Sequence, residues 1–285
     1  MTDPFHIAGP ACISFSGGRT SALLLRRVLD AHEGTLPADV HVLFANTGKE
    51  REETLAFVNE CAVRWGVTIH WVEWGGVEPP RNRTVCRVVD FASAHREGEP
   101  FERWLRFRGY LPGSGLRMCT TELKIRVMKR WMRDHGYDAW TNVVGLRVDE
   151  PARVARALGP TRERWENLCP LATAGITVRD VAAYWREAPF DLQLRSDEGN
   201  CDLCYMKSPE KRVQLMRERP ESAAWWIAQE QWADSVGAES NRWRLHQPNY
   251  ATLRDLALVP TAQLAPRTRQ LRLFGEDSLP CACTD

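Results

Sequence analysis

The sequence lacks two features that would narrow its class at once: a long apolar run and a strong excess of one charge. No stretch approaches the roughly 18 consecutive apolar residues of a membrane span, so we expect no membrane partner. The 285 residues include 38 Lys and Arg against 37 Asp and Glu, for a net charge of +1. This balance excludes a protein that is basic throughout and binds nucleic acid by its overall charge. Because 44% of the residues are hydrophobic, we also exclude a disordered chain.

Common catalytic motifs are missing as well. The seven histidines show no H-E-x-x-H spacing, and no G-x-S-x-G turn occurs, which argues against zinc proteases and serine hydrolases. Neither the Walker motif G-x-x-x-x-G-K-[ST] nor the dinucleotide motif G-x-G-x-x-G is present. The first residues, MTDPFHIAGP, lack the basic and apolar regions of a secretory signal, so we expect a cytoplasmic protein.

The nine cysteines do not suggest a disulfide framework, because their number is odd and no secretory signal precedes them. In a reducing compartment, clustered cysteines more often bind metal or carry out redox chemistry. The spacing Cys201-Asp-Leu-Cys204 is therefore a candidate site. Taken alone, this C-x-x-C fits half of a zinc site, a redox pair or half of an iron–sulfur site.

Hydrophobic patterning predicts strands that alternate with helices. We expect strands over 11–15, 39–45, 67–74 and 140–146, and helices over 21–32, 122–136 and 176–188. A helix that ends near residue 65 follows a capping box at Thr47 and Glu50. The alternation predicts an open, mostly parallel α/β sheet of the Rossmann-like type. We place a domain over residues 1–207 and a C-terminal extension over 208–285, helical at first and rich in loops over its last 40 or so residues.

A glycine turn follows the first predicted strand and precedes the first helix. It consists of Ser16, Gly17, Gly18, Arg19, Thr20 and Ser21. Backbone N–H groups and the positive end of the helix point outward at such a junction, and glycines let an anion come close. The hydroxyls add donors and Arg19 adds a cation. The turn therefore predicts a phosphate or sulfate site.

Four segments in order resemble the phosphoadenosine phosphosulfate (PAPS) reductase-like family. That family belongs to the PP-loop ATP pyrophosphatases of the adenine nucleotide alpha hydrolase superfamily. The segments are SFSGGRTS (14–21), VLFANTGKEREETLAFV (42–58), VVGLRVDEPAR (143–153) and LCPLATAGITVRDVAAYW (168–185). They match, in turn, the family's S-G-G-x-[DT]-S turn, its [DN]-T-G strand end, its G-x-R-x-x-E-x-x-R segment and its P-L plus T-x-x-D-V helix. The matches extend over roughly two-thirds of the chain.

The resemblance implies an adenine nucleotide at the carboxyl ends of the strands, in agreement with the rule for open α/β sheets. Residues 16–21 would hold a phosphate or sulfate, and Asn46, Thr47 and Gly48 would lie near the adenosine. Gly145 and Arg147 would close over the nucleotide. Many relatives that use ATP have Asp where this chain has Thr20, and threonine is a weaker magnesium ligand. Mg²⁺ and the choice between ATP and a sulfonucleotide (PAPS or APS) therefore stay open.

The resemblance also implies a ligand set for a [4Fe–4S] cluster. Cys119 matches the first cysteine region of the iron–sulfur sulfonucleotide reductases, and the C-x-x-C at 201 and 204 follows at a similar distance. The second cysteine of the family's C-C pair is Thr120 here, so Cys169 would supply the fourth thiolate. A structural zinc and unliganded thiols are the alternatives. Lys124 is a candidate catalytic residue beside the cluster and the substrate anion.

The sulfonucleotide reductases also carry a nucleophilic cysteine on a mobile tail, within E-C-G-L-H. This chain ends LPCACTD without that motif, so Cys283 is a candidate nucleophile on weaker grounds. Separately, residues 81–133 carry thirteen Lys and Arg against five Asp and Glu. This excess favours a polyanionic ligand, such as a nucleotide, transfer RNA or DNA.

We therefore interpret the sequence as an iron–sulfur, adenine-nucleotide-dependent enzyme of sulfur chemistry. In the favoured mechanism ATP adenylylates an acceptor, a nucleic acid or a small molecule, and sulfur then displaces AMP. A sulfonucleotide reductase that releases sulfite with the help of a thiol electron donor is the first alternative. A cluster-bearing module that binds nucleotide or nucleic acid without turnover is the second.

Overall fold

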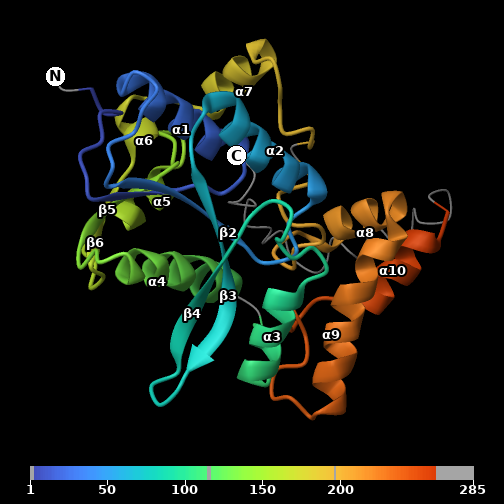
Figure 1. The fold of residues 1–285 in the computed structure, drawn as a ribbon. Helices are drawn as coiled ribbons and strands as arrows, with labels where there is room; N and C mark the ends of the chain where they lie inside the picture. Colours follow the sequence, from blue (N-terminus) through green and yellow to red (C-terminus); the bar gives the residue numbers. More distant parts are fainter. Residues whose placement is uncertain (1–2, 114–116, 196, 261–285) are drawn as a thin grey trace.

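The computed structural model describes residues 3–113, 117–195 and 197–260. Its centre is a six-stranded sheet in the order β4-β3-β2-β1-β5-β6, in which only β4 runs antiparallel to its neighbour (Figure 1). The strands are β1 (Ala11–Ser14), β2 (Val40–Asn46), β3 (Ile69–Glu78), β4 (Arg83–Val89), β5 (Trp140–Val144) and β6 (Trp165–Leu168). The predicted open, mostly parallel α/β sheet is confirmed.

Helices cover both faces of the sheet. The helices before residue 200 are α1 (Arg19–Ala31), α2 (Glu52–Trp65), α3 (Glu99–Arg108), α4 (Arg126–Asp134), α5 (Pro151–Leu158), α6 (Pro170–Thr173) and α7 (Val178–Glu187). Side chains of α1, α2 and α7 share one core cluster with one face of the sheet. Side chains of α3 and α4 share a second cluster with the opposite face.

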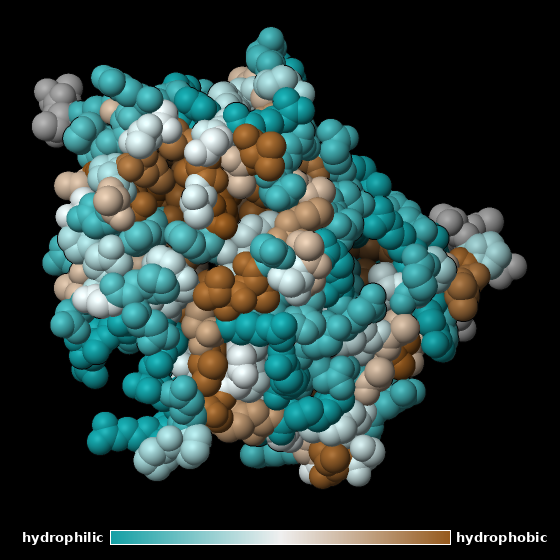
Figure 2. Space-filling model, viewed as in Figure 1, coloured by the Kyte–Doolittle hydropathy of each residue, from teal (hydrophilic) through white to brown (hydrophobic). Residues whose placement is uncertain are grey.

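The C-terminal part is helical, with α8 (Pro209–Glu218), a 3-10 turn η2 (Pro220–Ser222), α9 (Ala223–Ser235) and α10 (Tyr250–Leu258). These helices lie beside α3 in Figure 1 and join the second core cluster, where Trp226 stacks on Tyr250 with ring centroids 5.2 Å apart. Residues on both sides of position 207 thus contribute to this core, and the predicted boundary there stays a prediction. Figure 2 shows hydrophilic residues over most of the face viewed, with smaller hydrophobic patches between them.

Several elements differ from the prediction, which contains no helix where α3 and α5 lie. Strand β4 carries Arg83 and Arg87 and buries only one of its seven residues, so its pattern does not indicate a strand. Strand β6 has only four residues. Helix α10 occupies part of the segment predicted to be loop, and the side chain of Asn249 caps it by accepting a bond from the backbone N–H of Thr252. None of the helices within the described ranges is long and apolar enough to cross a lipid bilayer.

The helix predicted over 122–136 has two parts. A π-helix, η1 (Cys119–Ile125), runs directly into α4. Such wide turns are rare in proteins and are frequent at functional sites. Here the π-helix carries both Cys119 and Lys124, two of the residues predicted to take part in chemistry.

Candidate functional site

The glycine turn joins β1 to the N-terminus of α1, as predicted. Gly17 has a φ of +78°, which L side chains rarely adopt, and an added Cβ would lie 2.7 Å from Cγ2 of Thr54. The Ser21 hydroxyl donates to the Gly18 carbonyl at 2.9 Å and accepts from the Ser16 hydroxyl at 2.9 Å. The turn is therefore shaped by its own side chains, with a helix N-terminus behind it that favours an anion.

Two side chains of the turn point to protein partners. Arg19 forms two bonds to Asp191, at 2.7 and 2.6 Å, so its guanidinium engages this carboxylate rather than standing alone at the turn. Thr20 is fully buried, and its hydroxyl accepts a bond from Arg147 at 3.3 Å. Arg147, which follows Thr20 by 127 residues in the sequence, thus brings a second guanidinium to the turn.

The segment after β5 packs closely on the glycine turn. An added Cβ at Gly145 would lie 3.2 Å from the Cα of Ser21, so a side chain there would push the two backbones apart. Arg147 is buried and is oriented by Asp149, whose carboxylate accepts from its Nε at 2.9 Å. The pKa of Asp149 is lowered; burial opposes the shift, and the bonds from the backbone N–H of Val178 and from Arg147 produce it. The geometry brings Gly145 and Arg147 to residues 16–21.

Asn46, Thr47 and Gly48 form the turn after β2. The Asn46 amide donates to Glu73 at 2.7 Å and to the His95 carbonyl at 2.8 Å. Gly48 has a φ of +78°. Thr47 and Glu50 do bond to each other, as the capping box predicts, but α2 begins only at Glu52 with Arg51 as its N-cap. The Thr47–Glu50 pair instead closes the turn and fixes the Glu50 carboxylate.

Glu50 is a site residue that the sequence did not single out. Its side chain is fully buried, and one oxygen lies 3.0 Å from Nζ of Lys124 and 3.9 Å from Sγ of Cys201. The other oxygen accepts from the backbone N–H and hydroxyl of Thr47, at 2.7 and 2.8 Å. One carboxylate thus joins the turn after β2, the π-helix and the C-x-x-C segment. In the sequence, Glu50 stood out only through its spacing from Thr47, which is that of a capping box.

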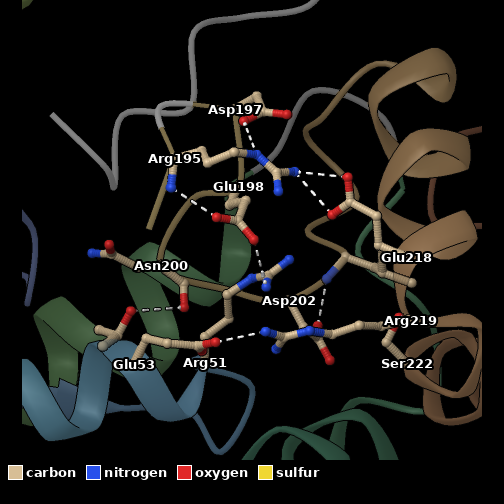
Figure 3. Close-up of polar contacts among 12 residues, drawn as sticks. Arg51, Glu53, Arg195, Asp197, Glu198, Asn200, Asp202, Glu218, Arg219 and Ser222 are labelled. Atoms are coloured by element: carbon tan, nitrogen blue, oxygen red, sulfur yellow. Dashed lines mark hydrogen bonds and ion pairs between the residues drawn. The ribbon is translucent and has the colours of Figure 1, made fainter. Parts of the chain in front are cut away.

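The segment that carries the C-x-x-C is anchored to both the first domain and α8. Asn200 donates its side-chain amide to the Ser16 carbonyl at 2.8 Å, and its own carbonyl accepts from the backbone N–H of Arg51 at 2.7 Å. Figure 3 shows the surrounding ion pairs, which link Arg51 to Glu198, Arg195 to Glu218, and Arg219 to Glu53. These bonds fix residues 198–202 against the glycine turn.

The four predicted cluster cysteines do not share one location. Sγ of Cys119 lies 3.7 Å from the hydroxyl of Tyr205, the pKa of which is raised by burial and by the nearby Cys119 and Cys204. Cys201 and Cys204 belong to the same segment, and Cys119, Cys201 and Cys204 all pack in the second core cluster.

Cys169 follows β6, an edge strand of the sheet, whereas η1, which carries Cys119, packs against β2 and β3. Burial raises the pKa of its thiol. Within residues 3–113, 117–195 and 197–260, no three His, Cys, Asp or Glu side chains are grouped so as to hold a metal ion. Cys283 lies outside the described residues.

A cavity of about 550 Å³ opens beside the glycine turn. Ser16, Ser21 and Gly145 line one end of it, and Lys124 lines the wall formed by η1 and α4. Its floor is the face of β1, β5 and β6, and Arg153, Arg156 and Ala157 of α5 line the opposite wall. The volume lies within the range of small-molecule sites, roughly 300–1,000 Å³. The cavity is thus continuous with the glycine turn.

Much of the positive charge over 81–133 is paired within the protein. Eight of its thirteen cations form ion pairs with acidic residues: Arg83, Arg96, Arg106, Lys124, Arg126, Lys129, Arg130 and Arg133. Several of these acidic partners lie outside the segment, including Glu50, Glu52 and Glu163. The charge excess in the sequence therefore overstates the positive charge of this surface.

The fold is that of an open, mostly parallel α/β protein with a glycine turn after its first strand and a cavity beside that turn. The family model of the phosphoadenosine phosphosulfate reductase domain matches residues 10–192, and the chain belongs to this family, whose members bind adenine nucleotides.

Two curated relatives match in sequence. The uncharacterized nin region protein ORF290 of Escherichia phage lambda is 32% identical over 204 residues, which cover 70% of this chain and 67% of the phage protein. An uncharacterized protein of Methanocaldococcus jannaschii is 27% identical over 145 residues, which cover 50% of this chain but only 24% of that protein.

Two solved structures are similar at low identity. A phosphoadenylyl-sulfate (PAPS) reductase from Candida auris, in a phosphate complex, is 16% identical with a TM-score of 0.40, over 67% of this chain and 82% of its own. The U34-tRNA thiolase NcsA from Methanococcus maripaludis, with its [4Fe-4S] cluster, is 11% identical with a TM-score of 0.37, over 80% of this chain and 74% of its own.

Proposed function

We propose that this protein is an adenine-nucleotide-dependent enzyme of sulfur chemistry that adenylylates an acceptor and exchanges the AMP for sulfur. The observation that carries the proposal is the meeting of Lys124 and Cys201 at the buried carboxylate of Glu50. This cation and this thiol lie beside a turn suited to nucleotide phosphates, because Asn200 ties the C-x-x-C segment to Ser16. A protein that only binds a nucleotide does not need a thiol at this position.

The proposed reaction uses the residues as follows. The β- and γ-phosphates of ATP bind at residues 16–21, with Arg147 over the turn and Lys124 on the cavity wall. An acceptor oxygen attacks the α-phosphorus, the bond to pyrophosphate breaks, and AMP becomes attached to the acceptor. A reduced sulfur nucleophile then displaces AMP. In both steps the protein positions the reactants and stabilises the charge that develops on phosphate oxygens.

The proposal includes a [4Fe–4S] cluster that would hold or activate the sulfur. Two contacts support it: Cys119 lies 3.7 Å from the hydroxyl of Tyr205, and Cys201 lies 3.9 Å from Glu50. Cys169, the fourth ligand that the sequence predicts, follows β6. Because no three of these thiols are grouped as a metal site within the described residues, the ligand set stays a prediction.

Iron and acid-labile sulfide assays after anaerobic purification test the cluster. We expect a brown protein that loses its colour in Cys119→Ser, Cys201→Ser and Cys204→Ser. The variants Cys169→Ser and Cys283→Ser identify the fourth ligand, with Cys61→Ser, a buried helix cysteine, as the matched control. A colourless protein that holds zinc tightly contradicts the cluster.

Pyrophosphate release tests the enzymatic part of the proposal. We expect ATP to bind and to release pyrophosphate only when an acceptor is present, and assays with and without Mg²⁺ determine whether Thr20 suffices where relatives have Asp. Candidate acceptors are transfer RNA, DNA and small molecules. Release that depends on added RNA or DNA identifies a nucleic-acid partner, which the partly paired cations of residues 81–133 support only weakly.

Two alternatives predict other outcomes. A sulfonucleotide reductase would release sulfite from PAPS or APS in the presence of a thiol electron donor, and would lose this activity in Cys283→Ser. A binding module would take up nucleotide stoichiometrically without turnover. Binding of neither ATP nor PAPS by the anaerobically purified protein would contradict all three.

A further inference from the structure

The cavity beside the glycine turn extends away from the turn that follows β2. In the sheet order, β2 lies on one side of β1, and β5 and β6 lie on the other. The floor of the cavity is the face of β1, β5 and β6. In the proposed reaction the phosphates of ATP bind at residues 16–21, and the adenosine lies near residues 46–48. Most of the cavity is therefore on the far side of the phosphates from the adenosine, where an acceptor would meet the α-phosphorus.

The charged side chains that line the cavity are mostly basic. Four lysine and arginine side chains line it, against the one carboxylate of Glu163. Among the described residues Arg156 has no ion-pair or hydrogen-bond partner, and it is exposed at the wall formed by α5. A guanidinium binds a carboxylate through two parallel hydrogen bonds, so this wall favours a ligand that carries a carboxylate. The other three cations have acidic partners in the protein: Lys124 pairs with Glu50, Lys129 with Glu163, and Arg153 with Glu150.

The cavity offers no general base. Among the described residues that line it, there is no histidine, aspartate or tyrosine. Its two lysines and its one glutamate are held in ion pairs, and burial raises the pKa of the Cys12 thiol to about 12. An alcohol or an amine must lose a proton as it attacks the α-phosphorus, so it needs a base within hydrogen-bonding reach. A carboxylate is already ionised at neutral pH and needs no base.

The rest of the lining suits an apolar body behind the carboxylate. Ile125 lines the wall formed by η1 and α4, and it keeps 38% of its surface exposed although it is apolar. Trp140 and Trp165, at the start of β5 and β6, stack with ring centroids 5.2 Å apart. On the floor, the Asn142 amide donates to Oδ1 of Asn167 at 2.7 Å, so these polar groups bond partly to each other. An aromatic or aliphatic body would therefore find apolar contacts along this wall and at the tryptophans.

We propose that the cavity binds a carboxylic acid with an apolar body, held through its carboxylate by Arg156, and that this acid is the acceptor. The inference rests on the proposed function, because it names the class of acceptor that ATP would adenylylate. Transfer RNA and DNA, the competing acceptors, lack a carboxylate.

The reaction balances without a redox partner. One carboxylate oxygen attacks the α-phosphorus of ATP, the bond to pyrophosphate breaks, and an acyl adenylate forms. Hydrosulfide then attacks the acyl carbon, and the bond between that carbon and the AMP oxygen breaks. The products are AMP, a thiocarboxylate and a proton. Sulfur keeps its oxidation state, so neither step needs an oxidant or a reductant.

Matched pairs of a carboxylic acid and its amide test the binding. We choose naphthoate with naphthamide and hexanoate with hexanamide, because the members of each pair have nearly the same shape and only the acid is charged. We expect calorimetry of the wild-type protein to show at least about tenfold tighter binding of the acid in one pair or both. In Arg156→Gln this preference should fall below about threefold. Arg186→Gln, at an exposed position on α7 that does not line the cavity, is the matched control and should keep the preference.

The wild-type series needs no variant, so the inference stays testable if Arg156→Gln fails to fold. Equal affinity for acid and amide in both pairs, or no binding of either acid, would overturn the inference and leave the proposed function standing with another acceptor. An unchanged preference in the folded variant would overturn the role of Arg156.

Isotope transfer tests the role of the acid as acceptor. With ATP and hydrosulfide present, an acid that binds and is labelled in its carboxylate oxygens should pass one labelled oxygen to AMP, which mass spectrometry detects. Binding without this transfer would overturn the acceptor role. Failure of the wild-type protein to bind ATP would instead overturn the proposed function.

Discussion

The side-chain amide of Asn200 donates a hydrogen bond of 2.8 Å to the carbonyl of Ser16, across 184 residues of sequence. The first glycine turn and the C-x-x-C segment are therefore one structural unit. A ligand that orders the turn also orders the backbone next to Cys201, because Asn200 precedes Cys201 directly. Thermodynamic linkage then requires the reverse effect. A ligand that binds at the cysteines and alters the affinity of the turn for its own ligand has its own affinity altered by the same factor.

Replacing Asn200 with alanine should weaken this coupling. We expect Asn200→Ala to lower the free energy of unfolding by about 1 kcal/mol, since the partly buried Ser16 carbonyl loses its partner. We also expect ATP to protect Cys201 from alkylation in the wild type and to protect it less in the variant. Alkylation rates with and without ATP, read by mass spectrometry, measure the effect. Asn241→Ala, which removes an amide that bonds to Asp234, is the control. Equal protection in the wild type and in Asn200→Ala would contradict the coupling.

Replacing Gly17 with alanine should destabilise the glycine turn. The residue has a φ of +78°, and a Cβ would meet Thr54 at 2.7 Å. We expect Gly17→Ala to lower the free energy of unfolding by about 2–4 kcal/mol and to abolish phosphate binding at the turn. Gly66→Ala isolates the clash, because Gly66 has a φ of +61° with nothing within 4 Å of its added Cβ. Urea unfolding should show a loss of about 1 kcal/mol for this control.

Removing the charge of Lys124 should leave the Glu50 carboxylate buried beside a thiol. We expect Lys124→Met to lower the free energy of unfolding by about 3 kcal/mol, and Glu50→Gln in the same chain to restore part of it. Lys129→Met is the control, since the Lys129–Glu163 pair is partly exposed and should contribute less than about 1 kcal/mol. Equal losses in Lys124→Met and Lys129→Met would contradict the role given to Glu50.

The carboxyl group of Glu230 should make stability depend on pH. Burial raises its pKa to about 7, although it accepts a bond from the backbone N–H of Tyr250 at 2.8 Å. A raised pKa means that the folded protein binds the proton more tightly than the unfolded chain does. Its contribution is therefore fully present below the unfolded pKa, near 4.5, and is lost as the pH rises through about 7.

Glu230→Gln tests this dependence. We expect the variant to be more stable than the wild type at pH 8 by about 3 kcal/mol, with little difference at pH 4.5, because glutamine can still accept the bond from Tyr250 without carrying charge. Urea unfolding of both proteins from pH 4.5 to 8.5 measures the difference. A difference that does not change with pH would contradict the assignment to Glu230.

The sequence predicted the parts of the site that depend on backbone shape. Gly17 was found because glycine suits the tight turn there, whereas Gly145 came from the family resemblance and the structure shows its close approach to Ser21. The sheet was predicted because its central strands are continuous apolar runs. Strand β4 was missed because its exposed arginines resemble a loop, and its pairing with β3 is what orders it.

The contacts between distant side chains were not predictable in the same way. Arg19 was expected to serve the anion, but it pairs with Asp191, 172 residues away. Glu50 looked like a capping residue, because nothing in the local sequence shows that Lys124 and Cys201 approach it. The amide pair of Asn142 and Asn167 depends on the register between β5 and β6, which a single sequence does not reveal.

The π-helical winding of η1 determines the directions in which the side chains of η1 and α4 point around the helix axis. In this segment Cys119 reaches Tyr205 while Lys124 reaches Glu50. If the same seven residues wound as an ordinary α-helix, Cys119 would turn by about 90° relative to Lys124, so Cys119 could not reach Tyr205 while Lys124 reaches Glu50. Both contacts therefore depend on the π-helical winding of these residues.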